Sequence, residues 1–289
     1  MLVAFIDRHP TEMEESLLML TLSTYCDGSG SLICKNGDVK PGWRDAERCV
    51  AAALNGIATE SKGIFDVLLM DPTRPNTYLG IDVKTKAASN VKNRRYLASG
   101  GLKSDCRAYL EVSNSDAEFW SVLNKKGITS SNILEGNNPQ IAGKAIIDTI
   151  NGWHEKARRE HVCLSKGATI DIEKSIYLAL SYSTDTNLGE YWQFHSFPLQ
   201  LRHADRWTFK IGKGGKKSRS IVGYDPDYPR EVLYEYYYSS GSQFKYYPRI
   251  SSAQYCSRPF KLRKPKPLSL LEKVKEYWPE EYAKLRYDV

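Results

Sequence analysis

Apolar and polar positions in the first part of the chain follow the spacing of helices and then of strands. Residues 11–25 are patterned as a helix, and in residues 43–54 apolar side chains recur every three or four positions, as on one helix face. Two apolar runs follow at 64–70 and 78–85, and the sequence DPTRPN between them favours a turn. The predicted order is therefore a helix followed by two connected strands.

The pattern continues with further elements up to residue 182. It predicts a strand at 107–112, helices at 113–127 and 144–161, and a well-marked apolar strand at 175–182. Helices and strands in this order predict an α/β or α+β fold, in which helices flank a mixed central sheet.

Beyond residue 200 the chain changes character. Short strands rich in tyrosine are predicted at 206–212, 218–225, 230–240 and 242–250, and a helix at 267–278. Tyrosine is a favoured residue in half-buried strands, so we expect most of these side chains to be structural. The tail is thus predicted to be a β-rich elaboration of the core.

These patterns divide the chain into three stretches. We expect a helical segment with a loop or hairpin at 1–42, a core at 43–200, and the elaboration at 201–289, either separate or continuous with the core as one domain. A chain of 289 residues buries such a core without disulfides, and its six cysteines form no C-x-x-C pair. The start reaches Asp7 too early for a signal-peptide core, so the cytoplasm is the expected compartment.

The net charge of +7 is concentrated in one stretch. Residues 202–266 hold fifteen Lys or Arg and five Asp or Glu, a balance of +10, which leaves −3 for the remainder. This asymmetry predicts a polyanionic partner, although a solvated basic face would give the same count. No zinc-protease HExxH, phosphate-binding P-loop or GxSxG elbow occurs in the sequence.

Charged residues interrupt the first two strand-like runs. Asp66 opens one run, and Asp82 and Lys84 share one face of the other because they are two residues apart. Neighbouring strands would bring the two carboxylates close together, where they repel unless a cation holds them ionised. Hard oxygen ligands with retained waters suit Mg²⁺, and Glu47, inside the apolar face of the preceding helix, would join them. An ordinary cross-strand Asp82–Lys84 ion pair is the alternative.

A helix with a glutamate, a strand with an aspartate, a turn, and a strand with D-x-K resembles the active-site layout of the PD-(D/E)XK nuclease superfamily. The matching residues are Asp66 in GIFDVLL, Asp82 and Lys84 in GIDVKTK, and Glu47 in WRDAERCVAAAL. Phe65, not proline, precedes Asp66, which departs from the family pattern. The resemblance covers about half of the chain and rests on few fixed letters.

The resemblance implies a site and a chemistry. Asp66, Asp82 and Glu47 would bind Mg²⁺, for which Mn²⁺ would substitute, and Lys84 would complete the catalytic set for phosphodiester hydrolysis. Glu60 also precedes Asp66 and is the alternative helix acid.

Within that superfamily the chain looks most like a type II restriction endonuclease, because a catalytic core carries a basic elaboration. This likeness implies sequence-specific cleavage of double-stranded DNA by a homodimer in the cytoplasm of a prokaryotic host, since one site cuts one strand. A repair or modification-dependent nuclease of the same superfamily, or a catalytically silent nucleic-acid-binding protein, is the alternative.

Candidate DNA contacts lie in three stretches. Phosphates would be bound by a run in the tail that consists of Lys213, Lys216, Lys217 and Arg219. Bases would be read in a groove from the following hairpin, by Gln243, Lys245 and Arg249. The competing reading element is the loop that leaves the D-x-K strand, with Lys92, Arg94, Arg95 and Lys103.

Overall fold

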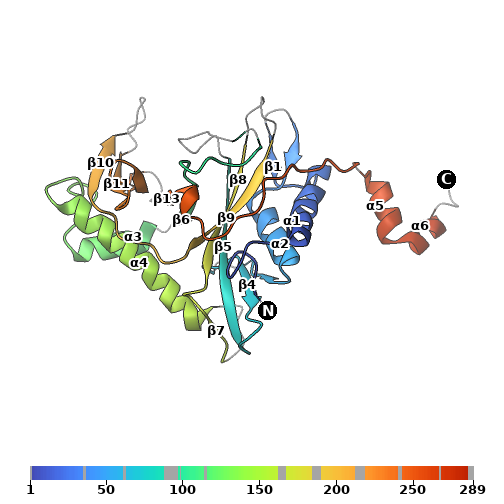
Figure 1. The fold of residues 1–289 in the computed structure, drawn as a ribbon, viewed down its shortest axis with the longest axis horizontal. Helices are drawn as coiled ribbons and strands as arrows, with labels where there is room; N and C mark the ends of the chain where they lie inside the picture. The colour runs from blue at the N-terminus through green and yellow to red at the C-terminus, as the bar shows by residue number, and fades with distance from the viewer. Residues whose placement is uncertain are drawn as a thin grey trace.

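A computed structural model shows a mixed α/β fold in which helices cover a central sheet and a second sheet stands beside it (Figure 1). The structure describes residues 2–34, 37–60, 63–87, 97, 99–113, 116–161, 167–183, 190–211, 219–239, 243–266 and 268–285. The predicted fold class is confirmed.

The N-terminal segment forms a helix and a short hairpin, as the sequence predicts. Helix α1 (Glu12–Thr24) begins at a capping box headed by Thr11. Strands β1 (Leu32–Ile33) and β2 (Val39–Lys40) then pair antiparallel, and α2 (Trp43–Ala53) follows them.

The central sheet is mixed, with the strand order β3-β4-β5-β8-β9. Its strands are β3 (Ile57–Ala58), β4 (Val67–Met70), β5 (Thr77–Ala87), β8 (Ile176–Tyr182) and β9 (Trp192–Pro198), and the short β7 (Thr169–Ile170) also pairs with β5. β5 runs parallel to β8, whereas β4 and β9 run antiparallel to their neighbours. The sequence pattern predicts β4, β5 and β8 but misses β9.

A second sheet is antiparallel throughout, with the order β10-β11-β12-β13-β6. Its strands are β10 (Trp207–Ile211), β11 (Arg219–Tyr224), β12 (Val232–Tyr237), β13 (Gln243–Tyr246) and β6 (Leu110–Ser113). The strand expected at 107–112 is therefore present as β6, but it pairs with β13 and not within the central sheet. Consequently the expected boundary at residue 200 separates β6 from the other strands of its sheet.

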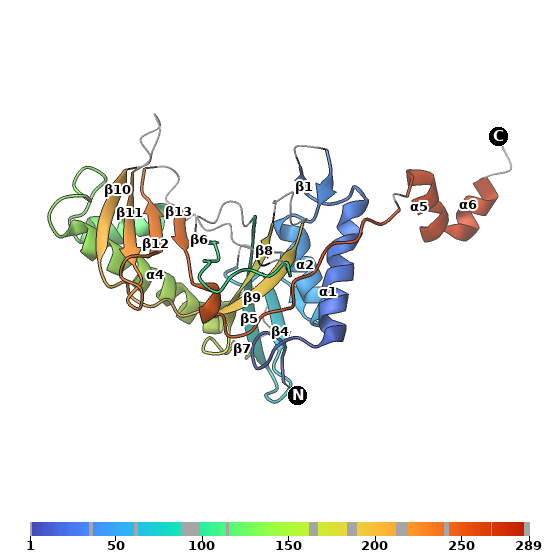
Figure 2. The same ribbon diagram turned by 45° about the horizontal axis from the view of Figure 1, so that its top comes forward.

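Helices bury both faces of the central sheet and join it to the second one. On one face α1 and α2 cover the strands, and Val50 of α2 is fully buried in their apolar cluster. On the other, α3 (Asp116–Lys125) and α4 (Asn138–Glu160) belong to a cluster that includes both Ala179 of β8 and Tyr234 of β12. The two sheets thus share one hydrophobic core, and α4 extends from the second sheet toward β7 of the central one (Figure 2).

Tyrosines of the second sheet alternate between its two faces. Tyr234 and Tyr236 are fully buried in the shared core, and the Tyr234 ring stacks on Trp207 with centroids 5.9 Å apart. Tyr237 lies on the opposite face and is half-buried. A structural role is therefore confirmed for the tyrosines that point inward.

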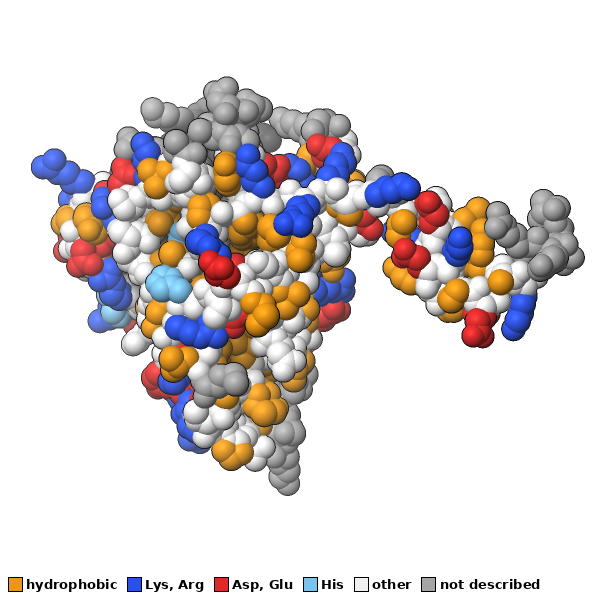
Figure 3. Space-filling view, turned by 45° about the vertical axis from the view of Figure 1, so that its right-hand side comes forward, with side chains coloured by type: hydrophobic (Ala, Val, Ile, Leu, Met, Phe, Trp, Pro, Cys, Tyr) orange, Lys and Arg blue, Asp and Glu red, His pale blue; other side chains and the backbone are white. Residues whose placement is uncertain are grey.

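After the second sheet the chain returns to the central one. A bridge pairs Trp192 with Phe260, so this segment runs along the outer edge of β9. It leads to α5 (Leu270–Tyr277), which the sequence predicts, and to α6 (Pro279–Leu285), which it does not. Both stand apart from the body (Figure 3). No helix within the described ranges is long and apolar enough to cross a bilayer.

A glycine in β5 lets an aromatic ring lie directly against the strand. A Cβ at Gly80 would lie 2.4 Å from Cδ1 of Phe65, a fully buried ring that immediately precedes Asp66. We expect Gly80→Ala to lower the free energy of unfolding by about 1–3 kcal/mol, because the ring has to move. Urea-induced unfolding of the two proteins measures the difference.

The matched control is Gly152→Ala on α4, where nothing lies within 4 Å of the added Cβ. This change should be neutral or stabilise by up to about 1 kcal/mol, because alanine is the better helix former. Equal effects of the two substitutions would contradict the steric explanation.

Candidate active site

Asp66 lies where β4 begins, and both its backbone and its side chain are fixed to β5. The Asp66 N–H donates to the Ile81 carbonyl at 3.0 Å, and Asp66 Oδ2 accepts from the Val83 N–H at 2.8 Å. These bonds lay the carboxylate against β5, where it shares a cavity with Lys84.

Asp82 and Lys84 form an ion pair on one side of β5. The Lys84 ammonium group contacts Asp82 Oδ1, and Asp82 is only 3% exposed. This contact gives the buried carboxylate one direct positive partner. A carboxylate has further lone pairs, so Asp82 could also take part in binding a cation.

Helix α2 supplies a third carboxylate. Glu47 is 8% exposed, and the charges of Lys84 and Asp82 both act on it. Glu60 lies instead on the surface, where it accepts a hydrogen bond from Arg48 Nε at 2.7 Å. The structure therefore brings Glu47, and not Glu60, to Asp66 and Lys84.

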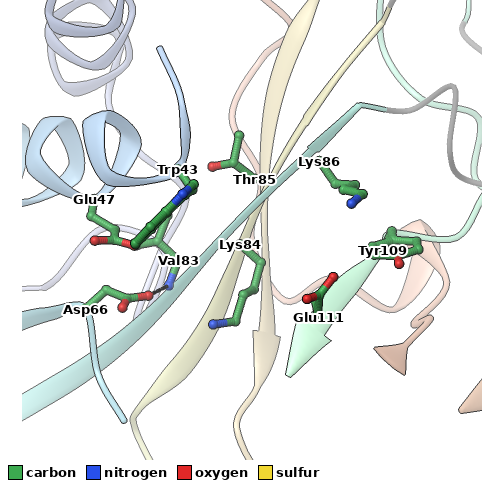
Figure 4. A pocket seen from close by; sticks show the side chains of 9 residues that line it. All are labelled: Trp43, Glu47, Asp66, Val83, Lys84, Thr85, Lys86, Tyr109 and Glu111. Carbon is green, nitrogen blue, oxygen red and sulfur yellow. Dashed lines mark hydrogen bonds between the residues drawn. The ribbon is translucent and has the colours of Figure 1, made fainter. Parts of the chain in front are cut away.

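A cavity of about 480 Å³ is lined by Glu47, Asp66 and Lys84, while Asp82 is not one of its lining residues and reaches it through Lys84 (Figure 4). Its lining consists of Trp43, Glu47, Asp66, Val83, Lys84, Thr85, Lys86, Tyr109 and Glu111. Figure 4 shows Glu47 and Asp66 on one side, Lys84 between the walls, and Lys86, Tyr109 and Glu111 on the other side. The volume lies within the range of pockets that bind small molecules or parts of larger substrates.

Burial and neighbouring charges raise the pKa values of Asp66 and Glu47. Burial, followed by the charge of Asp82, raises the pKa of Asp66 against the opposing effect of Lys84. Burial also raises the pKa of Glu47 to about 7, again opposed by Lys84. Burial alone would lower the pKa of Lys84, but the carboxylates together outweigh it and raise that pKa, so the lysine stays protonated.

This donor set fits a hard divalent cation. In the part of the chain that the structure describes, no three His, Cys, Asp or Glu side chains converge as a closed metal site. Mg²⁺ does not require one, since one or two carboxylates and several waters usually hold it. Burial and the charge of Asp82 raise the pKa of Asp66 despite Lys84, so a cation beside these carboxylates would stabilise their ionised forms. Asp66 and Asp82 are therefore suitable ligands, with Glu47 on the same cavity.

A buried tyrosine and histidine lie behind the ion pair, and the sequence analysis did not identify them. Tyr177 of β8 is the register partner of Asp82, and its hydroxyl lies 3.2 Å from Nε2 of His154 on α4. Burial lowers the pKa of His154 to about 4, so the ring is neutral at physiological pH. Only the strand register reveals this contact, because Tyr177 sits in an ordinary apolar run.

Most of the expected phosphate contacts fall outside the described residues. These are Lys92, Arg94, Arg95, Lys213, Lys216, Lys217 and the side chain of Arg219. Lys103 is described and exposed.

The hairpin residues expected to read bases are already engaged within the protein. Arg249 donates from Nε to Glu231 at 3.0 Å, and its guanidinium lies 3.5 Å from the Tyr228 ring centroid. Nζ of Lys245 lies 4.1 Å from the Tyr237 ring centroid. Gln243, which begins β13, is half-buried. Base reading by this hairpin stays a prediction.

Comparison with known proteins assigns no family to the chain. No family model matches it, and neither a curated protein nor a solved structure gives a match. The likeness to PD-(D/E)XK nucleases therefore rests on the residues and the geometry described above.

The raised pKa values predict how pH affects the stability of the metal-free protein. A carboxyl group whose pKa rises on folding holds more protons in the folded state. Its contribution to stability therefore falls as the pH rises from the unfolded pKa near 4 to the folded pKa, which is about 7 for Glu47 and about 9 for Asp66. We expect Asp66→Asn to raise the free energy of unfolding at pH 8 by on the order of 1–3 kcal/mol, with a smaller effect at pH 5. Urea unfolding in EDTA at both pH values measures this.

Each variant is compared with the unchanged protein at the same pH, which cancels the contributions of other titrating groups. Glu118→Gln, an exposed glutamate on α3, is the control and should show no pH-dependent difference. A destabilising effect of Asp66→Asn at pH 8 would contradict the charge repulsion inferred at the site.

Proposed function

We propose that this protein is a Mg²⁺-dependent endonuclease that cleaves double-stranded DNA at specific sequences, as type II restriction enzymes do. The observation that supports this function is the convergence of Glu47, Asp66 and Lys84 on one cavity, with Asp82 paired to Lys84. An ordinary Asp–Lys ion pair does not account for the two additional carboxylates on the cavity, buried Glu47 and half-buried Asp66.

The side chains of the site have different roles in phosphodiester hydrolysis. Asp66 and Asp82 would hold the divalent cation, which would supply Lewis-acid chemistry for the phosphate and its attacking water. Lys84 stays protonated beside them, so it binds a non-bridging phosphate oxygen and stabilises the negative charge that develops there. Glu47 accepts hydrogen bonds from water on the same side of the cavity. Mn²⁺ substitutes for Mg²⁺ because it prefers similar oxygen ligands.

The same proposal identifies the partners. The balance of +10 in residues 202–266 suits a DNA duplex, whose phosphates such cations neutralise. Each chain offers one such cavity, and cutting both strands of a two-fold target requires two, so we propose a homodimer. A prokaryotic cytoplasm is the compartment that accompanies such an enzyme.

Removal of either member of the ion pair tests the catalytic assignment. We expect Lys84→Ala and Asp82→Ala each to slow Mg²⁺-dependent cleavage by about three orders of magnitude or more, because these groups act on the reacting phosphate and its cation. Duplex binding should stay within about threefold, since other groups contact the backbone and bases. The purified proteins are incubated with phage DNA, and fragment ends are sequenced.

EDTA should abolish cleavage by the unchanged protein, and added Mg²⁺ or Mn²⁺ should restore it. Lys126→Ala, which removes an exposed lysine, is the control and should cut normally. Near-normal cleavage by Lys84→Ala would refute the assignment of the site.

A second pair of variants distinguishes the two candidate helix acids. Glu47→Gln should slow cleavage by about tenfold to a thousandfold, because it removes a carboxylate from the cavity. Glu60→Gln should leave the rate unchanged, because Glu60 pairs with Arg48 on the surface. Initial rates on one supercoiled plasmid compare them directly, and the reverse result would make Glu60 the catalytic acid.

A further inference from the structure

Two lysines lie close to one aromatic ring on the side of the cavity opposite Asp66. Lys86 and the ring of Tyr109 line the cavity, whereas Lys245 approaches the same ring without being one of the lining residues. Lys86 of β5 and Lys245 of β13 place their Nζ atoms 4.9 Å and 5.4 Å from the centroid of the Tyr109 ring. Figure 4 shows Lys86 and Tyr109 together on this wall. Ammonium groups from two different sheets therefore flank a single ring at the edge of the candidate active site.

Neither ammonium group is neutralised by a direct ion pair. Among the described residues, no salt bridge joins Lys86 or Lys245 to a carboxylate, although Glu111 and Glu235 are register partners of Lys245. Glu235 already accepts hydrogen bonds from two hydroxyl groups. Two like charges beside one ring favour an anion near them. Burial lowers the pKa of Lys245, the charges of Glu111 and Glu235 oppose this shift, and the charge of Lys86 adds to it.

We propose that Lys86, Lys245 and Tyr109 form a second phosphate-binding site, which holds a backbone phosphate next to the one that is cleaved. The identity of the anion as DNA rests on the function proposed above. Lys86 follows Lys84 by two residues on the same side of β5, so their Cα atoms are about 6.6 Å apart. One DNA strand that crosses the cavity therefore meets the two lysines at successive phosphates.

Ammonium groups select phosphate over a base edge at this place. Lysine is a point charge without the planar fork of donors that arginine offers to a base. The Tyr109 ring stabilises both cations through its face, and burial raises the pKa of its hydroxyl, so the ring stays neutral. The role of Lys245 thus changes from base reading to positioning of the backbone.

The first test measures duplex binding without cleavage. Full-length protein binds a fluorescent duplex in EDTA over a range of salt concentrations. Lys86→Ala and Lys245→Ala should each lower the slope of log affinity against log salt by about one, whereas the arginine variants Lys86→Arg and Lys245→Arg should keep it. Lys156→Ala, which removes an exposed lysine of α4, is the matched control for loss of one charge.

A second test separates positioning from catalysis and from loss of structure. In Mg²⁺, the alanine variants should raise KM about tenfold and keep kcat within about threefold, because the scissile phosphate still meets Lys84. In a series of duplexes, one phosphate at a time is replaced by a neutral methylphosphonate. Replacement of a single phosphate beside the cut should lower the affinity of the unchanged protein about tenfold. The same replacement should not lower the affinity of the double variant Lys86→Ala/Lys245→Ala, because the ammonium groups that bind this phosphate are already absent.

The outcomes distinguish this inference from the proposed function. Mg²⁺-dependent cleavage with unchanged salt slopes and an unchanged methylphosphonate profile in the variants would overturn the phosphate site and leave the nuclease standing. Altered slopes without cleavage by the unchanged protein would support the phosphate site and overturn the nuclease. No binding to any duplex would overturn both.

Discussion

A protonated lysine among buried carboxylates is the arrangement on which the rest of this site depends. Lys84 touches Asp82, shares its cavity with Asp66 and Glu47, and keeps 23% of its side chain exposed. One positive charge does not balance three carboxylates in a poorly solvated place, and the raised pKa values of Asp66 and Glu47 report this deficit. The deficit is a cost in stability that a bound divalent cation would relieve.

The fold tolerates this cost because β5 is held on both sides. Its residues pair with β4 through one register and with β8 through another, and the Phe65 ring packs against Gly80 just before Asp66. Helix α2 packs on the same strands and brings Glu47 to them. The charged groups therefore sit on the most constrained part of the sheet, where little reorganisation is needed when a substrate arrives.

The local patterns that bring Glu47, Asp82 and Lys84 together were visible in the sequence. A two-residue spacing placed Asp82 and Lys84 on one face, and the 3.6-residue period placed Glu47 in the buried arc of its helix. Long-range pairing was not visible. The sequence pattern did not predict strand β9, because polar residues interrupt its apolar run although they are buried. One of them, Gln193, donates a hydrogen bond to the carbonyl of Ser257. β6 was expected in the central sheet because pattern predicts a strand but not its partner.

Strand β6, which was expected in the central sheet, completes the cavity from the second sheet. Because β6 joins β13, Tyr109 and Glu111 face β5 and supply the second wall. Arg107, two residues before Tyr109 and only 6% exposed, anchors this wall through Asp225 at 2.9 Å and the Tyr247 carbonyl at 2.5 Å. A buried charge with this many partners is rigid, and breaking its pairs is costly. The two walls therefore carry different charged groups: Glu47 and Asp66 lie on one side of Lys84, and Lys86 lies with Glu111 on the other. Under the proposed function, a phosphodiester backbone and its cation would contact both walls, so the two halves of the cavity would act as one site.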